Sequence, residues 1–199
     1  VKSQLHNYPS ITLGSDEVTL MDMTTGFGVL AKGGLQMNPY IIEEIRNSKG
    51  DLLYSNPVTN APRIYPENLA ADMNSMLTRV VVAGTGGAAR IPGWDVAGKT
   101  GTSQDWRDAW FLGYTTKFVG GVWVGNDDDK PMAKITGGEM SARIWGDMMK
   151  VALKDIPPES LPGAKQPEEY LSSEAQERLN FYRRLGSAFS AVEARGGPG

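Results

Sequence analysis

The sequence has no cysteine and only one histidine, His6. Without cysteine the chain can form no disulfide bond, no thiolate nucleophile and no cysteine-based zinc site. A single histidine also removes metal sites built on a histidine pair and most catalytic triads that use histidine as the base. Chemistry in this chain must therefore come from serine, threonine, lysine or carboxylate side chains, and we expect neither a metal ion nor an organic cofactor.

Excess positive charge and long apolar runs are also missing. Twenty Lys and Arg stand against 23 Asp and Glu, which gives a net charge of −3 at pH 7 and a pI near 5.3. No nucleic acid partner is expected, because phosphate binding needs a basic surface. The longest apolar runs, such as Val80–Ala83, fall far short of the roughly 20 residues that a membrane-spanning helix needs. We therefore expect no membrane span in this stretch.

The 199 residues, 40% of them hydrophobic, suffice for one compact domain with a tail. Apolar residues at helical spacing predict helices over 16–32 and 66–83, each ended by glycine. Between them, two short runs of strand-forming residues, 40–45 and 51–54, flank the glycine-containing turn 47–50. This pattern predicts a hairpin.

Three stretches with strand character follow a glycine-rich segment, over 95–103, 108–115 and 117–125. The spacers between them are too short for a crossover helix, so the strands are predicted to form an antiparallel meander. A helix over 140–154 should cover the sheet, with Trp110, Trp123 and Trp145 in the core between them. This order of elements predicts an α/β fold of the α+β type.

Composition changes after the last predicted helix. The stretch that follows is rich in proline, glutamate and serine, and the chain ends in Gly196–Gly199. Such segments bury too little apolar surface to fold on their own. We therefore expect a folded domain over 1–155 and a linker with a partly disordered tail over 156–199.

The sharpest motif is GWDVAGKT at 93–100, which matches the P-loop pattern G-x-x-x-x-G-K-[ST] letter for letter. In a nucleotide-binding P-loop, a buried strand precedes the motif and a helix begins at the lysine, so that helix amides bind the phosphates. Here the motif follows 88–92 and continues into 100–105, whose glycine and β-branched residues favour a strand and a turn. We interpret the match as accidental, and a P-loop NTPase is the alternative from another function class.

As an extended strand, Lys99–Thr102 has a different use. Gly101 leaves the backbone bare, so an extended peptide can lie against it. Thr100 and Thr102 project from one face and bring two hydroxyls near a cation, which suits the binding of a carboxylate. The simpler interpretation is an ordinary edge strand with a surface lysine.

These residues resemble the KTG box of the penicillin-binding proteins and serine β-lactamases. The resemblance extends to GTGGAARIPGWDVAGKTGTSQDWRDAWFLGYTTKFVGGVWVGNDDDKPM and, upstream, to PSITLGSDEVTLMDMTTGFGVLAKGG. Over most of residues 9–153 the chain is similar to class A, bifunctional penicillin-binding proteins. The resemblance implies a β-lactamase/transpeptidase-like fold with helices packed on an antiparallel five-stranded sheet. It also implies an active-site serine that is acylated by the D-Ala-D-Ala end of a peptidoglycan stem peptide or by a β-lactam.

The sequence departs from this family in one respect. No serine is followed three positions later by lysine, and no S-x-N triplet occurs. In the family both boxes precede the helix predicted at 16–32, and the chain begins at Val1 without an initiator methionine. The fold is thus expected to be incomplete on its N-terminal side. An upstream segment or a second chain would carry S-x-x-K and S-x-N, and this chain alone is expected to be inactive.

The resemblance assigns catalytic roles to Lys99 and Thr102. Lys99 would hold the S-x-N serine and the terminal carboxylate of the substrate. The backbone N–H of Thr102 would supply half of the oxyanion hole, and the other half would come from the N–H of the nucleophile. The Thr100 and Thr102 hydroxyls would bind the carboxylate. The substrate-binding strand is expected to comprise Thr100, Gly101, Thr102 and Ser103.

Two alternatives stay open from the sequence. Gly84–Gly86 lies near the cleft in the family, either as a plain turn or in contact with substrate.

The function implied is a serine DD-transpeptidase, with a β-lactam sensor or serine β-lactamase-like protein as the alternative. The expected location is extracytoplasmic, at the periplasmic face of the inner membrane, with the membrane anchor outside this chain.

Because the P-loop match lacks its strand and its helix, we expect the chain not to bind ATP. Isothermal titration calorimetry measures this directly. Micromolar affinity for ATP that disappears in Lys99→Ala would contradict the expectation.

Overall fold

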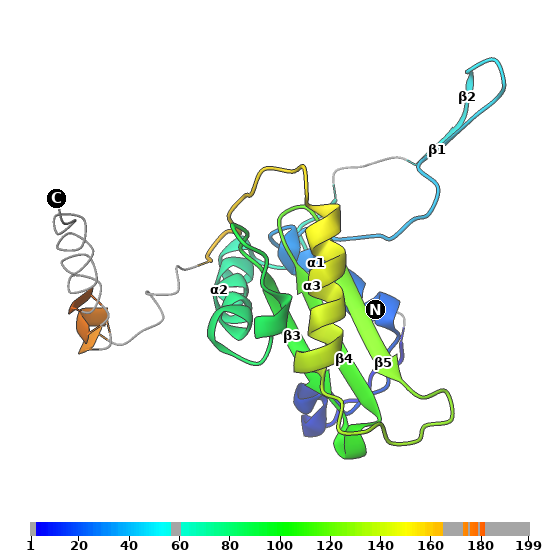
Figure 1. Cartoon of the computed structure of the whole chain (residues 1–199). Coiled ribbons are helices and arrows are strands. Elements are labelled where there is room, and N and C mark those ends of the chain that lie inside the picture. The colour runs from blue at the N-terminus through cyan, green and yellow to red at the C-terminus, as the bar shows by residue number, and fades with distance from the viewer. Residues whose placement is uncertain (1–2, 57–60, 165–172, 175, 179, 182–199) are drawn as a thin grey trace, which may run out of the picture. The chain divides into compact units, whose positions relative to one another are not determined.

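The computed structural model describes the chain apart from residues 1–2, 57–60, 165–172, 175, 179 and 182–199 (Figure 1). Contacts divide the chain into two compact units, Val1–Ala164 and Lys165–Gly199. The first unit carries the described strands and the helices α1 to α3. Most of the tail predicted for 156–199 lies outside the described residues, and the proposed domain division stays a prediction.

A three-stranded antiparallel sheet forms the centre of the first unit. Its strands are β3 (Ala97–Thr102), β4 (Asp108–Tyr114) and β5 (Val119–Gly125), in the order β3-β4-β5. Gly101 is paired with Trp110, and Trp110 with Trp123. The predicted meander is therefore confirmed, and among the described strands β3 forms one edge of this sheet.

The hairpin predicted between the first two helices is present as β1 (Glu44–Arg46) and β2 (Leu52–Ser55). It forms a separate two-stranded sheet, and all of its strand residues are exposed. In the described residues the central sheet therefore has three strands, not the five that the family resemblance implies. The strands β1 and β2 pair only with each other, and in the turn between them the Asn47 N–H donates to the Asp51 carbonyl. The hairpin therefore adds no strand to the central sheet.

Helices α1 (Leu20–Ala31) and α2 (Glu67–Ala83) lie close to their predicted ranges. The prediction began α1 four residues too early. Thr19 fixes the true start, because its hydroxyl accepts a hydrogen bond from the Asp22 N–H at 3.1 Å and its backbone is extended. Helix α3 (Ala142–Ala152) follows a π-helical turn, Gly137–Ser141. The predicted helix over 140–154 takes in the last two residues of that turn and ends two residues beyond α3.

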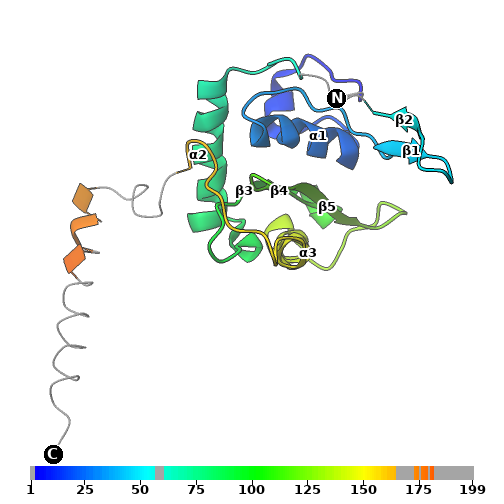
Figure 2. The ribbon, with the colours of Figure 1, turned by 90° about the horizontal axis from the view of Figure 1, so that it is seen from above.

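Helices α1 and α3 cover opposite faces of the central sheet, and α2 lies beside β3 (Figure 2). Two adjacent glycines in β5 show how closely the helices approach. A Cβ added to Gly121 would meet Leu20 and Thr24 of α1, whereas one added to Gly120 would meet Trp145 and Met149 of α3. The sheet is thus held between two helices that touch its backbone.

The core on the α3 side is built around Trp145. Its indole is fully buried, packs edge-on against Phe111 at 5.4 Å between ring centroids, and donates from Nε1 to the Gly120 carbonyl at 3.1 Å. The prediction that Trp110 and Trp123 share this core is wrong. Trp123 is 38% exposed, because its indole lies along the sheet surface and donates to the Asp108 carboxylate, and its cross-strand partner Trp110 is only half-buried.

A buried polar network ties α2 to β4 and to the segment after α3. The Tyr114 hydroxyl donates to Asn74 Oδ1 at 2.6 Å, and Asn74 Nδ2 donates to the Pro162 carbonyl at 2.9 Å. Burial raises the pKa of the Tyr114 hydroxyl, so it stays a protonated donor. Leu161 packs into the same region with 2% exposure. The stretch predicted to be a linker from 156 is therefore packed on the fold as far as Ala164.

Among the described residues, no helix has the length and apolar character that crossing a membrane requires.

We expect Asn74→Ala to lower the free energy of unfolding by about 1–3 kcal/mol, because it leaves the buried Tyr114 hydroxyl and the Pro162 carbonyl without partners. Thr78→Val, one turn further along α2, is the matched control. The Thr78 hydroxyl is buried without a hydrogen-bond partner, so its removal should leave stability unchanged or raised. Urea denaturation measures both, and equal losses would contradict this account.

Candidate active site

Strand β3 presents the Lys99–Thr102 motif at an edge of the sheet. Ala97 packs against residues of α1, so Lys99 and Gly101, which alternate with it, face the α1 side. Thr100 and Thr102 face the α3 side. The Lys99 ammonium donates to the Thr100 carbonyl at 2.6 Å and is exposed. A carboxylate that meets both the cation and the hydroxyls must therefore lie between the two faces, at the edge of β3 that pairs with no described strand.

The position of Lys99 rules out the P-loop geometry. The lysine lies in the middle of a strand that is paired residue by residue with β4, from Ala97 with Tyr114 to Thr102 with Ala109. No helix begins at Lys99, so the amide cradle that binds phosphate is not formed by GWDVAGKT.

The Thr100 hydroxyl is not free. Its Oγ1 lies 2.7 Å from Oγ1 of Thr85, which comes from the loop after α2. That loop folds back on the helix end, where the Gly86 N–H donates to the Val80 carbonyl at 2.9 Å. The segment Gly84–Gly86 is thus a turn whose threonine contacts β3, a use that the sequence alone did not distinguish from a substrate contact.

The Thr102 hydroxyl is held from another direction. Its Oγ1 accepts a hydrogen bond from the Gly137 N–H at 3.2 Å, at the start of the π-helical turn before α3. A Cβ on Gly137 would lie far inside contact distance of the Trp110 carbonyl and 2.5 Å from the Gly101 carbonyl. A Cβ on Gly138 would lie 2.5 Å from the Thr85 carbonyl. Only glycine lets this backbone lie directly on β3 and β4.

Ser103 begins the loop from β3 to β4. Its Oγ accepts from the Asp108 N–H at 2.8 Å, and its own N–H donates to the Asp108 carbonyl at 3.0 Å. Inside this loop Asp105 and Trp106 both have positive φ, 59° and 54°. Non-glycine residues adopt this left-handed region at a cost, which neighbouring contacts must offset.

A second loop supplies contacts to this strained one. Arg107 pairs with the Asp129 carboxylate at 2.7 Å, the Met132 N–H donates to the Trp106 carbonyl at 3.0 Å, and the Lys134 ammonium lies 5.9 Å from the Trp106 ring centre. The Asp127–Asp129 run therefore belongs to an exposed turn that braces the β3–β4 loop.

The acidic turn contains an exposed ion pair. Lys130 lies 2.6 Å from the Asp128 carboxylate and lowers the pKa of that carboxyl. Over the part of the chain that the structure describes, no cluster of three or more His, Cys, Asp or Glu side chains is placed to hold a metal ion.

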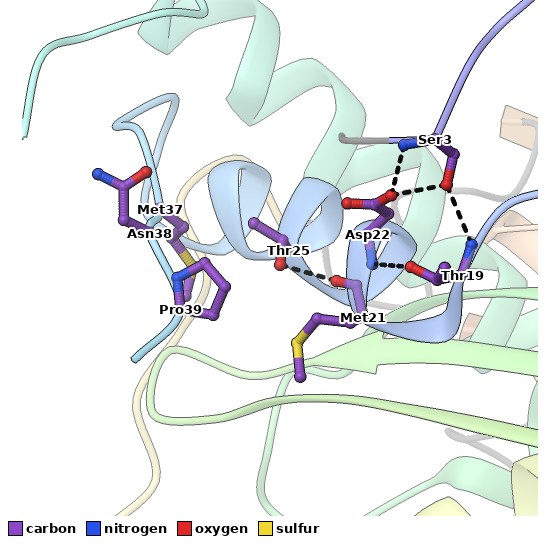
Figure 3. A pocket seen from close by; sticks show the side chains of 8 residues that line it. All are labelled: Ser3, Thr19, Met21, Asp22, Thr25, Met37, Asn38 and Pro39. Atoms are coloured by element: carbon purple, nitrogen blue, oxygen red, sulfur yellow. Dashed lines mark hydrogen bonds between the residues drawn. The ribbon is translucent and has the colours of Figure 1, made fainter. Parts of the chain in front are cut away.

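One pocket lies beside α1, and no residue of β3 lines it. It has a volume of about 390 Å³ and contains none of the predicted site residues; its lining is Ser3, Thr19, Met21, Asp22, Thr25, Met37, Asn38 and Pro39 (Figure 3). The Asp22 carboxylate in this pocket accepts hydrogen bonds from the Ser3 N–H at 2.8 Å and the Ser3 hydroxyl at 2.6 Å. Its carboxylate is thus engaged in holding the N-terminal segment against α1.

Comparison with known proteins identifies the family of this chain. The family model described as "Penicillin binding protein transpeptidase domain" matches residues 5–150. The chain belongs to this family. Penicillin-binding protein 1A of Aquifex aeolicus is 36% identical over 165 residues, which cover 79% of this chain and 23% of that protein. Penicillin-binding protein 1A of Neisseria meningitidis is 34% identical over 180 residues, or 87% of this chain and 22% of that protein.

A solved structure shares the fold of this transpeptidase-domain chain. PonA1 of Mycobacterium tuberculosis, in complex with penicillin V, superposes with a TM-score of 0.71 at 26% identity, covering 79% of this chain and 44% of that one. The β-lactamase/transpeptidase-like fold class is thereby confirmed. The chain spans less than a quarter of the length of the curated relatives described above.

Sequence reasoning on this transpeptidase-domain chain placed Lys99, Thr100, Gly101, Thr102 and Ser103 together, and the structure has them consecutively along β3 and its exit. It missed Gly137 and Gly138. The adjacent glycines just before an amphipathic helix were the available signal, because paired glycines at a helix start indicate a close backbone approach.

We expect Gly137→Ala to destabilise the chain by about 1–3 kcal/mol, because the new methyl group would overlap the Trp110 and Gly101 carbonyls. Gly26→Ala is the control. Gly26 lies inside α1 with nothing within 4 Å of its Cβ position, so alanine should stabilise the helix by about 0.5–1 kcal/mol. Thermal melts of both variants test this, and a neutral Gly137→Ala would show that the backbone approach is looser than described.

Proposed function

We propose that this chain is the KTG-bearing C-terminal part of a serine DD-transpeptidase that crosslinks peptidoglycan stem peptides and is acylated by β-lactams. The observation that carries the proposal is the edge strand β3. Its Lys99 and its Thr100 and Thr102 hydroxyls lie on either side of an edge with which no described strand pairs. An edge strand can pair with an extended peptide through its main chain. The penicillin V complex of PonA1, a related protein of the same fold, supports the β-lactam part.

The proposed substrate is a stem peptide that ends in D-Ala-D-Ala. Its terminal carboxylate would lie at this edge of β3, bound by the Lys99 ammonium and the two hydroxyls through charge-assisted hydrogen bonds. The penultimate carbonyl would then be directed toward the Thr102 N–H, which donates to the oxyanion as it forms. The same features fit a β-lactam, whose carboxylate and strained amide copy those two groups.

The proposed nucleophile is a serine outside these 199 residues, on an upstream segment or second chain that carries S-x-x-K and S-x-N. Its hydroxyl oxygen would attack the penultimate carbonyl, its proton would pass to the leaving D-Ala amine, and an acyl-enzyme would form. An amine of a second stem peptide would then displace the serine. Lys99 faces the α1 side of the sheet, so the segment it contacts should approach from that side.

A β-lactam sensor or a serine β-lactamase would use the same acylation step and differ afterwards. A sensor keeps the acyl group, a β-lactamase transfers it to water, and a transpeptidase transfers it to an amine. The sequence identity of 36% and 34% to penicillin-binding protein 1A of two organisms favours the transpeptidase. We further propose an extracytoplasmic location, on the periplasmic side of a membrane anchor that lies outside this chain.

We expect Lys99→Ala to slow acylation more than Thr102→Ala in the transpeptidase completed by its nucleophile-bearing segment. A hydrogen bond to a charged group contributes about 1.5–3 kcal/mol, so losing the Lys99 contact should cost about 10- to 150-fold in rate. Thr102→Ala keeps the backbone N–H and loses only a hydroxyl, so its effect should be smaller and should depend on a free carboxylate in the substrate.

The measurement is the second-order rate of acylation by a chromogenic β-lactam, with thermal melts to check folding. The 199-residue chain alone serves as the blank and should give no penicilloyl adduct in a mass spectrum. A folded Lys99→Ala variant that acylates at the original rate would overturn the role of β3, and an adduct on the chain alone would show that the nucleophile is misplaced.

A further inference from the structure

The contact between Thr85 and Thr100 joins the loop after α2 to the proposed carboxylate-binding strand. The two Oγ1 atoms are 2.7 Å apart, a full-strength hydroxyl–hydroxyl hydrogen bond in which either can be the donor. Both hydroxyls are at or near the surface, with Thr85 exposed and Thr100 partly buried. Neither is enclosed in the core, so this pair is not needed to satisfy buried polar atoms.

The backbone that carries Thr85 is fixed on two sides. After Thr85, the Gly86 N–H is bonded to the Val80 carbonyl, and Gly86 itself is buried against Phe111 and Val80. On the other side, the Thr85 carbonyl lies so close to Gly138 that a Cβ there would be 2.5 Å from it. Because its chain is held in this way, Thr85 presents its hydroxyl to Thr100 in a defined position.

A hydroxyl has only one proton to donate, which fixes the direction of the bond once a substrate is present. If Thr100 donates its proton to a substrate carboxylate, it cannot also donate to Thr85. Thr85 must then donate to Thr100 Oγ1, and this polarises the Thr100 O–H and strengthens its bond to the anion. Without Thr85, the Thr100 hydroxyl would be free to rotate away from the carboxylate.

We propose that Thr85 is a positioning residue for substrate recognition: it donates a hydrogen bond to Thr100 and so directs the Thr100 proton to the terminal carboxylate of the stem peptide or β-lactam. This inference rests on the proposed function. Thr85 acts through Thr100 and has no direct contact with the substrate in this scheme. Its contribution is therefore confined to ligands that carry a free carboxylate.

The experiment uses the complete transpeptidase domain and the second-order rate of acylation by a β-lactam, as the free acid and as its methyl ester. Thr85→Val removes the hydroxyl and keeps the shape, whereas Thr85→Ser keeps the donor. An exposed neutral hydrogen bond should be worth about a 2- to 12-fold rate change. Thr85→Val should therefore slow the free acid by that factor and leave the ester rate unchanged, and Thr85→Ser should react like the original protein.

The double variant Thr85→Val/Thr100→Val isolates the coupling. Because Thr85 acts only through Thr100, the double variant should be acylated no more slowly than the Thr100→Val variant alone. Equal losses of rate with acid and ester in Thr85→Val, an unchanged rate with the acid, or additive losses in the double variant would each overturn the inference. Absence of acylation in the unaltered domain would instead overturn the proposed function and this inference with it.

Discussion

Backbone packed directly on backbone is the constraint on which the site depends. At Gly137 and Gly138 the chain before α3 lies against the carbonyl groups of Gly101, Trp110 and Thr85, at distances that leave no room for a Cβ. Three segments that are distant in sequence meet there: the loop after α2, the strand pair β3–β4 and the start of α3. The Thr85 and Thr102 hydrogen bonds are both consequences of this meeting.

The packing of the sheet between α1 and α3 also fixes the position of β3. Gly120 and Gly121 let α3 and α1 approach the sheet from opposite sides, and Trp145 fills the space on the α3 side. A strand held between two close-packed layers has little freedom to bend, because close-packed protein interiors are hardly compressible. An edge strand in such a sheet can offer a bare backbone to a peptide and still keep its side chains in fixed positions.

Helical periodicity predicted the three helices, and the short spacers and the glycine-containing turn between strand-like runs predicted the meander and the hairpin, because each of these signals is local in the sequence. Boundaries depended on single contacts that periodicity does not contain, such as the Thr19 cap that starts α1. The candidate site is predicted along the contiguous residues Lys99–Ser103, which lie on β3 and at its end, and their role stays a prediction. The partners of its hydroxyls come from residues 85 and 137, and no local rule connects those positions to β3. Trp123 was misassigned because helices cover both faces of the sheet, and the alternation of residues does not show how far along β5 that cover extends.

The bond from Asn74 to the Pro162 carbonyl bears on where the chain can be shortened. Composition alone suggests cutting after residue 155, where proline and glutamate become frequent. Such a cut would remove the acceptor of a fully buried amide and would uncover the apolar surface beneath Leu161. The segment from residue 156 to Ala164 is therefore part of the folded unit. A truncated protein keeps these buried contacts only if it extends to Ala164.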